Sequence, residues 1–345
     1  MIRTLLILGF VCIAASAFAA DKPLVIAHRG ASGYLPEHTL EAYSRAVALG
    51  ADFIEPDLVS TKDGVLIARH ENELSDTTDV AEKFPTRKTK KVIDGRETEG
   101  WFSEDFTLAE IKTLRAKQRL AFRNQADNGK FPIPTLAEVI ALAKTEGAKR
   151  GRVVGLYPET KHPTYFQGIG LALEPPLVRE LKAAGLDRAD AAVFIQSFEV
   201  ANLKQLKSMT AAPLVQLLGG GDERPYDQEA LGSTLTYAAM ATPQGLREIA
   251  VYARGVGPFK GLIIPMDREG NTSAPTTFVA DAHAAGLKVH PYTFRNEAQY
   301  LAKPYGGDPI REYCAFYILG VDGLFSDFPD TALKARDESC PMTAR

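Results

Sequence analysis

The sequence has no internal repeat, no low-complexity tract and no Gly/Ser-rich linker that would divide it. It also lacks an excess of charge of one sign, since 40 basic and 43 acidic residues give a formal net charge of -3. The nearest approach to a basic patch, residues 87–91, is flanked by acidic residues, whereas nucleic-acid binding needs a basic surface. We therefore expect no nucleic-acid partner. The 345 residues suffice for one large barrel domain or two average ones.

Long hydrophobic runs are missing after the first twenty residues. Within them, Arg3 precedes an apolar run from Leu5 to Ala15, and Ala17-Phe18-Ala19 is a small-x-small cleavage signal. The run is too short to cross a bilayer core of about 30 Å. We interpret residues 1–19 as a cleaved signal peptide and residues 20–345 as the mature domain. The mature protein should then lie in the periplasm without a stable membrane anchor.

Cysteine is scarce, with three residues in the chain. Cys12 lies within the predicted signal peptide, which leaves Cys314 and Cys340. An even number of cysteines in an oxidising compartment is typical of disulfide-bonded proteins, although one buried and one exposed thiol would also fit. We predict a disulfide that ties the C-terminal tail to the last helix.

Short β-branched runs alternate with helical patterns along the chain. The predicted strands are Leu24–Ala27, Phe53–Val59, Val65–Ala68, Val153–Leu156, Ala192–Ile195, Leu214–Leu217, Gly261–Ile264, Leu287–His290 and Gly323–Phe325. The predicted helices are Thr39–Leu49, Leu136–Thr145, Pro176–Ala184, Glu199–Ser208, Gln244–Ala253 and Thr277–Ala285. This alternation indicates a parallel sheet with helical crossovers. The number of units favours a (β/α)8 barrel of the TIM type over an open doubly wound sheet.

Nine predicted strands compete for eight barrel positions. The strands Phe53–Val59 and Val65–Ala68 are joined only by a short turn ending in Gly64, so we expect the extra strand in this pair. After the third predicted strand, residues 71–131 contain no clean βα unit, although Leu108–Leu114 has the pattern of a short helix. Insertions of this length are usually functional. We expect this one to overhang the barrel mouth as a lid or substrate wall, with a mobile insertion of no role as the alternative.

Charged and imidazole side chains lie at the ends of the first four predicted strands, where barrel enzymes assemble their sites. Residues two apart in a strand point to the same face, so the two acidic residues on the second strand should project together. The same spacing recurs after the fourth strand. The candidate site residues are His28, Arg29, Glu55, Asp57, His70, Glu159 and Lys161.

Three carboxylates, those of Glu55, Asp57 and Glu159, are predicted to converge at the barrel mouth. Without compensation such a cluster would repel itself and raise its own pKa values. A bound divalent cation resolves this repulsion, and ligands that are all oxygen favour Ca²⁺ or Mg²⁺ over zinc. The alternative is that these carboxylates are exposed charges or pair with Lys161 and Arg69.

The two histidines are candidates for acid/base chemistry. Hydrolysis of a phosphodiester requires one group to deprotonate the nucleophile and another to protonate the leaving alkoxide. Imidazole pKa values near 6.5 suit both tasks, so His28 and His70 could divide them. Arg29 and Lys161 could hold the non-bridging phosphate oxygens. The alternatives are that both histidines have only structural roles and that Arg29 serves only as a salt-bridge partner.

The segments that carry these residues resemble the glycerophosphodiester phosphodiesterases, most strongly the bacterial periplasmic members. The match extends in order over essentially the whole mature chain, and the segments that carry it are residues 27–39, 55–64, 157–161, 289–295 and 323–330. The resemblance implies hydrolysis of glycerophosphodiesters, such as glycerophosphocholine and glycerophosphoethanolamine, to glycerol 3-phosphate and an alcohol. It does not imply a preferred headgroup, an attacking nucleophile or an oligomeric state.

The resemblance also implies a role for each matching residue. His28 and His70 correspond to the catalytic acid/base pair, and Arg29 to a phosphate-binding arginine. Lys161 corresponds to a substrate-contacting lysine. The three carboxylates correspond to the ligands of one divalent metal ion, with Ca²⁺ more typical of the periplasmic members than Mg²⁺. Their positions here are Glu55, Asp57 and Glu159.

Three positions depart from the broad family pattern. Glu71 follows His70 where Asp is usual, His38 replaces an Asn, and Tyr292 stands where a Trp is common. Glu71 bears on the orientation of His70, because Glu has one more methylene than Asp.

Two other functions remain open at this point. A secreted phospholipase C- or D-like enzyme acting on intact lipid would need apolar residues at the barrel mouth. The inserted segment does contain such residues, although they are spread among charges: Trp101, Phe102, Phe106 and Phe122. A periplasmic solute-binding protein would have two lobes and would not need paired histidines beside carboxylates.

Overall fold

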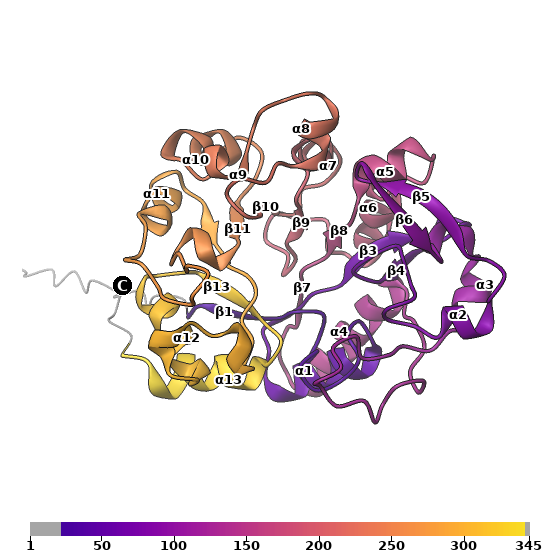
Figure 1. Cartoon of the computed structure of the whole chain (residues 1–345), viewed down its shortest axis with the longest axis horizontal. Coiled ribbons are helices and arrows are strands. Elements are labelled where there is room, and N and C mark those ends of the chain that lie inside the picture. The colour runs from indigo at the N-terminus through magenta and orange to yellow at the C-terminus, as the bar shows by residue number, and fades with distance from the viewer. Residues whose placement is uncertain (1–21, 342–345) are drawn as a thin grey trace, which may run out of the picture.

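The computed structural model describes residues 22–341, so the predicted signal peptide lies outside the described residues. Strands lie at the centre and helices around them (Figure 1). The strands are β1 (Leu24–Ala27), β2 (Phe53–Ile54), β3 (Asp57–Ser60), β4 (Leu66–Ala68), β5 (Thr89–Ile93), β6 (Arg96–Gly100), β7 (Gly155–Leu156), β8 (Glu159–Thr160), β9 (Ile195–Ser197), β10 (Leu214–Leu218), β11 (Gly255–Pro258), β12 (Lys288–Val289) and β13 (Gly323–Ser326). The α-helices are α1 (Leu40–Leu49), α2 (Val80–Lys83), α3 (Leu108–Ile111), α4 (Leu136–Lys149), α5 (Pro163–Gly168), α6 (Glu174–Ala183), α7 (Val200–Met209), α8 (Tyr226–Ala230), α9 (Tyr237–Met240), α10 (Pro243–Ala250), α11 (Phe278–Ala284), α12 (Pro309–Ile318) and α13 (Pro329–Lys334).

The strands form the predicted barrel of the TIM type. One sheet has the order β13-β1-β2-β7 and the other β12-β11-β10-β9-β8-β3-β4. A parallel bridge between Leu156 and Val193 connects the sheets on one side. On the other side, the Asp322 amide donates to the Val289 carbonyl over 2.9 Å. The hydrogen-bonded ladder is not continuous around the ring, so the barrel is only partly closed.

The second barrel position differs from the prediction. Instead of one strand over Phe53–Val59, β2 and β3 are separate and Pro56, which has no N–H to donate, lies between them. β4 pairs antiparallel with β3 at the end of its sheet. The extra predicted strand therefore lies in the expected pair and outside the parallel barrel.

One predicted strand is wrong. Residues 261–264 do not form a strand, and Lys260–Leu262 is a 3-10 turn. The sixth barrel strand is β11, which has the sequence Gly-Val-Gly-Pro. A Cβ atom on Gly257 would lie 2.5 Å from the end of the Leu217 side chain, so a larger residue there would displace Leu217 of β10. A glycine-rich strand has low β-propensity, which explains why the sequence pattern missed it.

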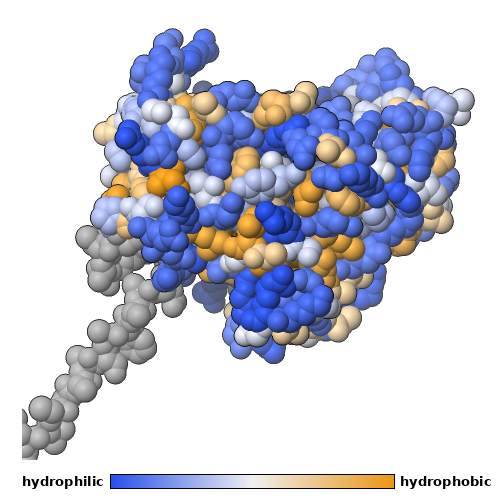
Figure 2. Space-filling model, turned by 90° about the horizontal axis from the view of Figure 1, so that it is seen from below, coloured by the Kyte–Doolittle hydropathy of each residue, from blue (hydrophilic) through white to orange (hydrophobic). Residues whose placement is uncertain are grey.

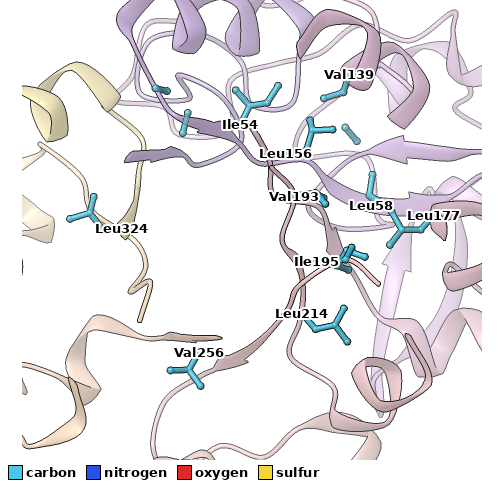
Figure 3. Close-up of a cluster of buried hydrophobic side chains, with 14 of the residues drawn as sticks. Ile54, Leu58, Val139, Leu156, Leu177, Val193, Ile195, Leu214, Val256 and Leu324 are labelled. Atoms are coloured by element: carbon cyan, nitrogen blue, oxygen red, sulfur yellow. The ribbon is translucent and has the colours of Figure 1, made fainter. Parts of the chain in front are cut away.

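The core has two layers. Apolar strand residues such as Ile54, Leu58 and Ile195 pack outward against the helices, where they meet Val139 of α4 and Leu177 of α6 (Figure 3). A smaller cluster contains Ile26, Phe53, Tyr157, Val215 and Phe325. Barrel interiors are filled by side chains in this way, so the chemistry is confined to the rim.

The inserted segment is structured rather than an open loop. It contains α2, α3 and the antiparallel hairpin β5–β6, and Phe102 and Phe106 are fully buried. The hairpin turn is Asp94-Gly95, in which both residues have positive φ. Asp-Gly is a strong signal for such a turn, but the flanking strands are rich in charge and were not predicted.

Cys314 and Cys340 form the predicted disulfide. Cys314 lies in α12, so the bridge ties the tail to the penultimate α-helix and not to the last one, α13. Within residues 22–341, no helix has both the length and the apolar character needed to span a membrane. Hydrophilic side chains cover much of the face in Figure 2, with hydrophobic ones interspersed.

Candidate active site

All seven candidate residues come together at one end of the barrel. β3 and β8 continue past the ring formed by β2 and β7, which places the carboxylates at the rim. His70 reaches the same place for a different reason than the predicted one. It follows β4, which runs antiparallel to β3, so the end of β4 meets the beginning of β3 at Asp57. A cavity of about 400 Å³ opens between the two histidines and is also lined by Arg29 and Lys161.

The three carboxylates converge as predicted. Glu55, Asp57 and Glu159 are buried, and one ligand atom from each lies within 4.8 Å of the others. Oδ1 of Asp57 is buried without a hydrogen-bond partner among the described residues. An unpaired buried carboxylate oxygen in an all-oxygen set is what a hard divalent cation would satisfy. The site therefore fits one metal ion.

Neighbouring side chains orient two of the three carboxylates. His38 donates from Nε2 to Asp57 Oδ2 over 2.9 Å, and its Nδ1 accepts from the Tyr43 hydroxyl over 2.7 Å. Gln196 of β9 donates to Glu55 Oε1 over 2.8 Å. Partners of this kind fix the direction of metal-binding oxygens.

The electrostatics of the cluster also favour a cation. Burial, and then the charges of Asp57 and Glu159, raise the pKa of Glu55 well above its ordinary value. Burial raises the pKa of Glu159 to about 7, although Lys161 opposes the shift. Burial would raise the pKa of Asp57 too, but His38 and the nearby cations outweigh it and lower that pKa. A divalent ion would hold all three groups in the ionised form.

His28 lies on one side of this cluster. Its Nδ1 is 2.5 Å from Oδ1 of Asp327, while its Nε2 is 4.0 Å from Glu55 Oε2. Burial would raise the Asp327 pKa, but His28, Arg295 and Arg123 lower it well below the ordinary value. Asp327 is therefore an ionised acceptor, Nδ1 carries the proton, and Nε2 is the nitrogen left for chemistry.

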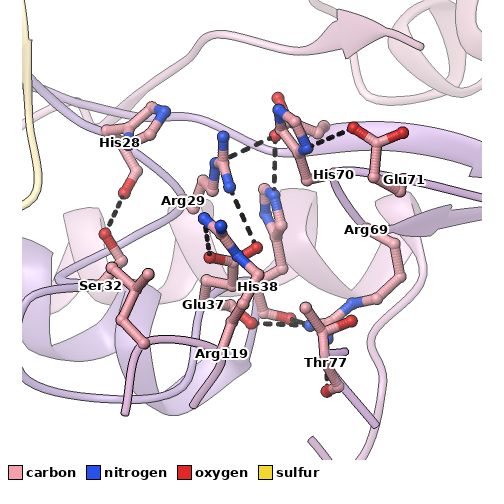
Figure 4. A network of polar contacts seen from close by, with 12 residues as sticks. His28, Arg29, Ser32, Glu37, His38, Arg69, His70, Glu71, Thr77 and Arg119 are labelled. Carbon is pink, nitrogen blue, oxygen red and sulfur yellow. Dashed lines mark hydrogen bonds and ion pairs between the residues drawn. The ribbon is translucent and has the colours of Figure 1, made fainter. Parts of the chain in front are cut away.

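His70 lies on the opposite side of Arg29 from His28 (Figure 4). Its Nδ1 lies 2.7 Å from Oε1 of Glu71, and its Nε2 lies 3.3 Å from Lys161 Nζ. Burial, followed by the charges of Arg29 and Lys161, lowers the pKa of His70; burial and Arg29 lower that of His28 to about 4. Both rings therefore have a carboxylate on Nδ1, while Nε2 of His28 faces Glu55 and Nε2 of His70 faces the Lys161 ammonium group.

Carboxylates hold the two positively charged side chains of the site, Arg29 and Lys161. Arg29 donates from Nη1 to Glu37 over 3.1 Å, and its Nε lies 3.4 Å from Asp57 Oδ2. Lys161 Nζ lies 2.9 Å from Glu159 Oε1. Arg29 is thus the salt-bridge partner considered as an alternative, yet it also lines the cavity, so the two descriptions are compatible.

The sequence analysis assigned no role to several residues that the fold brings to the site. They are Gln196, Arg123, Arg295 and Asp327. Asp327 had a usable signal, because it directly follows strand β13 at the barrel rim. Arg123 had none, since it lies in the irregular part of the insertion.

Known proteins resemble this chain over most of its length. The model of the glycerophosphoryl diester phosphodiesterase family matches residues 28–331. A glycerophosphodiester phosphodiesterase of Arabidopsis thaliana is 40% identical over 337 residues, which cover 93% of this chain and 88% of that protein. A glycerophosphodiester phosphodiesterase of Haemophilus influenzae is 34% identical over 337 residues, which cover 91% of this chain and 90% of that protein.

Solved structures share the fold. A phosphodiesterase of Oleispira antarctica, determined in complex with the product sn-glycerol-3-phosphate, superposes with a TM-score of 0.61 at 22% identity, covering 92% of this chain and 98% of that one. A glycerophosphodiester phosphodiesterase of Agrobacterium tumefaciens superposes with a TM-score of 0.58 at 19% identity, covering 90% of this chain and 98% of that one. Together with the family match and the two sequence relatives, this establishes the relationship. The chain is an enzyme of the glycerophosphoryl diester phosphodiesterase family.

Proposed function

We propose that the enzyme hydrolyses glycerophosphodiesters to glycerol 3-phosphate and an alcohol, with one divalent metal ion and two histidines. The observation that carries this proposal is the pair of His–carboxylate dyads, His28–Asp327 and His70–Glu71, beside the carboxylate cluster. The product named for the Oleispira antarctica structure supports the choice of substrate.

In the proposed reaction, the phosphate lies in the cavity between the two rings. The nucleophile is water, or a neighbouring substrate hydroxyl whose cyclic phosphate product water then opens. One histidine takes a proton at Nε2 from this nucleophile as its oxygen bonds to phosphorus, and the other gives a proton from Nε2 to the alcohol oxygen whose bond to phosphorus breaks. Each imidazolium is stabilised by the carboxylate on its Nδ1. Arg29 and Lys161 hold the non-bridging oxygens, where negative charge accumulates.

We propose Ca²⁺ as the metal in preference to Mg²⁺, held by Glu55, Asp57 and Glu159. A bound divalent ion would act as a Lewis acid on a phosphate oxygen. Mg²⁺ is usually held by one or two carboxylates and several waters, whereas Ca²⁺ accepts six to eight oxygens in flexible geometry. Three carboxylates therefore suit Ca²⁺ better.

The decisive experiment measures release of glycerol 3-phosphate from a panel of glycerophosphodiesters. The protein is first stripped with a chelator, and Ca²⁺ and Mg²⁺ are then restored separately. We expect no turnover after chelation and fuller recovery with Ca²⁺. Turnover unaffected by chelation would disprove the metal dependence, and absence of turnover with every substrate and metal would disprove the assigned activity.

A lipid substrate is less favoured by the insertion. Phe102 and Phe106 are buried in the core, and the Trp101 indole donates to the Phe84 carbonyl, so among the four aromatic residues only Phe122 is strongly exposed. An apolar platform for intact lipid needs a contiguous exposed patch. An intact phospholipid in the same substrate panel tests this alternative.

We also propose export to the periplasm. The N-terminal apolar run with its cleavage signal supports it, and the Cys314–Cys340 disulfide is typical of an oxidising compartment. N-terminal sequencing of the protein from a periplasmic fraction should begin at Ala20 or Asp21. An intact Met1 on that protein would contradict cleavage.

A further inference from the structure

Glu71, the carboxylate on His70, is held by a second histidine that the proposed chemistry does not use. Its Oε1 accepts from His70 Nδ1 over 2.7 Å, and its Oε2 accepts from His162 Nε2 over 2.9 Å. The other nitrogen of His162, Nδ1, lies 2.6 Å from Oδ2 of Asp94. The four side chains form one continuous line of hydrogen bonds, Asp94–His162–Glu71–His70.

The protonation of this line follows from its members. Burial would raise the pKa of Glu71, but hydrogen bonds from His162 and His70, together with the charges of His70 and Lys161, lower it. An ionised carboxylate has no proton to give. Since both partners of His162 are carboxylates, both of its ring nitrogens donate, and the ring is the positively charged form.

The line joins three separate parts of the fold. Glu71 begins the inserted segment after β4, His162 follows β8, and Asp94 is in the turn of the β5–β6 hairpin. Asp94 and His162 have φ values of 47° and 50°, in the left-handed region that non-glycine residues rarely adopt. Within residues 22–341, the other non-glycine residues with positive φ are Arg29 and His38, both at the site. Such conformations persist where the surroundings enforce them.

The two dyads differ in how their carboxylates are supported. Asp327 has a side chain only 3% exposed, and two arginines donate to it. The Glu71 side chain is 49% exposed, so packing does not fix it. The Glu71 side chain also has one more rotatable bond than the Asp327 side chain of the other dyad. A second anchor on its free oxygen is therefore needed to hold His70 in one orientation, and His162 supplies it.

We infer that His162 is a positioning residue for His70, acting through Glu71, with Asp94 as the outer anchor that couples the inserted hairpin to the reaction centre. The inference deepens the proposed function and rests on it for its kinetic test. It gives the insertion a role other than that of a lid: its hairpin fixes the direction of a catalytic imidazole.

The kinetic test is a double-mutant cycle. His162→Ala should lower kcat about tenfold, the lower end of what loss of a supporting hydrogen bond costs, and leave KM within a factor of about two. In a Glu71→Ala background the same change should alter kcat by less than about twofold, because the line is already broken. Equal losses in both backgrounds, or an unchanged kcat, would overturn the inference.

Two further variants separate positioning from general damage. His162→Gln keeps a donor near the Nε2 position and should recover most of the lost kcat. His283→Ala is the matched control, because it removes a His–carboxylate pair, with Asp322 at 2.7 Å, remote from the cavity. It should leave kcat unchanged. Loss of kcat equal to that of His162→Ala would show that the effect is not specific.

A measurement without turnover distinguishes failure of this inference from failure of the proposed function. The chain has six histidines, few enough for imidazole ¹⁵N NMR of the labelled protein. His70 should be the Nδ1–H tautomer in the wild type and a tautomer mixture in Asp94→Asn and His162→Ala. An unchanged His70 spectrum in folded variants would refute positioning whatever the substrate. Asp94→Asn, on the hairpin turn, keeps this test available if His162→Ala fails to fold.

Discussion

The Nδ1 atom of His28 lies 2.5 Å from Oδ1 of Asp327, although 299 positions separate the two residues in the chain. The contact forms where the first and last barrel strands, β1 and β13, run side by side in parallel register. It gives His28 the same hydrogen-bonded arrangement that Glu71 gives His70.

Replacement of Asp327 by Asn should disable His28 while leaving it in place. An amide can donate to Nδ1 and so favours the wrong tautomer, which in a comparable serine-protease triad costs about 10⁴-fold in kcat. We expect a loss of about 10²-fold or more in kcat/KM. Asp330→Asn, which affects a carboxylate bonded to Tyr34, is the control and should retain activity. Wild-type rates in Asp327→Asn would mean that the dyad has no catalytic role.

His28 and His70 should act as a complementary acid/base pair. We expect a bell-shaped pH dependence of kcat/KM and a loss of about 10²-fold or more for each His→Ala change. The double change should cost far less than the product of the single losses, because paired groups act as a unit.

A substrate with a p-nitrophenolate leaving group, which needs no protonation, assigns the two roles. It should rescue the variant that lacks the general acid and leave the variant that lacks the base impaired. Equal rescue of both variants, or near-normal activity of either on a natural glycerophosphodiester, would show that the pair is structural.

Asp57→Asn should abolish metal binding and activity together while the fold survives, because Asp57 lies at the rim and carries the unpaired oxygen. Ca²⁺ at 100 times its Kd should stabilise the wild type by about 2.7 kcal/mol through linkage, and the variant much less. Thermal unfolding with and without Ca²⁺ measures this. Asp76→Asn, in the inserted segment and exposed, is the control. If Asp57→Asn retained the Ca²⁺-dependent stabilisation, Asp57 would not be a metal ligand.

His162 should make stability depend on pH in the alkaline range. Burial opposes its charge, but hydrogen bonds from its ring to Asp94 and Glu71 raise its pKa to about 9. A histidine whose pKa is higher in the folded state than in the unfolded state stabilises the folded state below about pH 6.5. This stabilisation is lost as the pH rises through 9. One pKa unit corresponds to about 1.4 kcal/mol, and solvent screening at half-exposed Glu71 reduces the total to about 2 kcal/mol.

The measurement is urea unfolding of the wild type and His162→Asn at pH 6 and pH 10. The difference between the two proteins in free energy of unfolding should be larger at pH 6. A difference that stays constant, or grows toward pH 10, would contradict a charged His162.

In the denatured, unreduced protein, Cys314 and Cys340 should not react with thiol-specific reagents, because the disulfide leaves neither with a free thiol. Closing a loop with a sequence separation of 26 stabilises the folded state by about 3 kcal/mol in the chain-entropy model. Reduction should therefore lower the urea midpoint, and Cys314→Ala/Cys340→Ala should behave like the reduced protein under both conditions. Two titratable thiols before reduction would show that the bridge is absent.

The barrel class followed from the sequence because alternation of β-branched runs and helical patterns is a local property of the chain. Thr39 and Thr135 show how local such signals are, since each caps the helix that follows it through its own side chain. The carboxylate cluster was predicted for a related reason: Glu55 and Asp57 are neighbours in sequence, and strand direction brings Glu159 to the same rim.

The tertiary structure decided what depends on long-range contact. Local pattern could not show that β4 turns back, which brings His70 to the mouth from the opposite direction. Nor could it show that Asp327 completes the dyad of His28 from 299 positions away, or that His162 anchors Glu71 from 91 positions away. Residue types and spacings determine which groups are available for chemistry, but hydrogen bonds act over about 3 Å. Only the packing of distant segments brings them within that range.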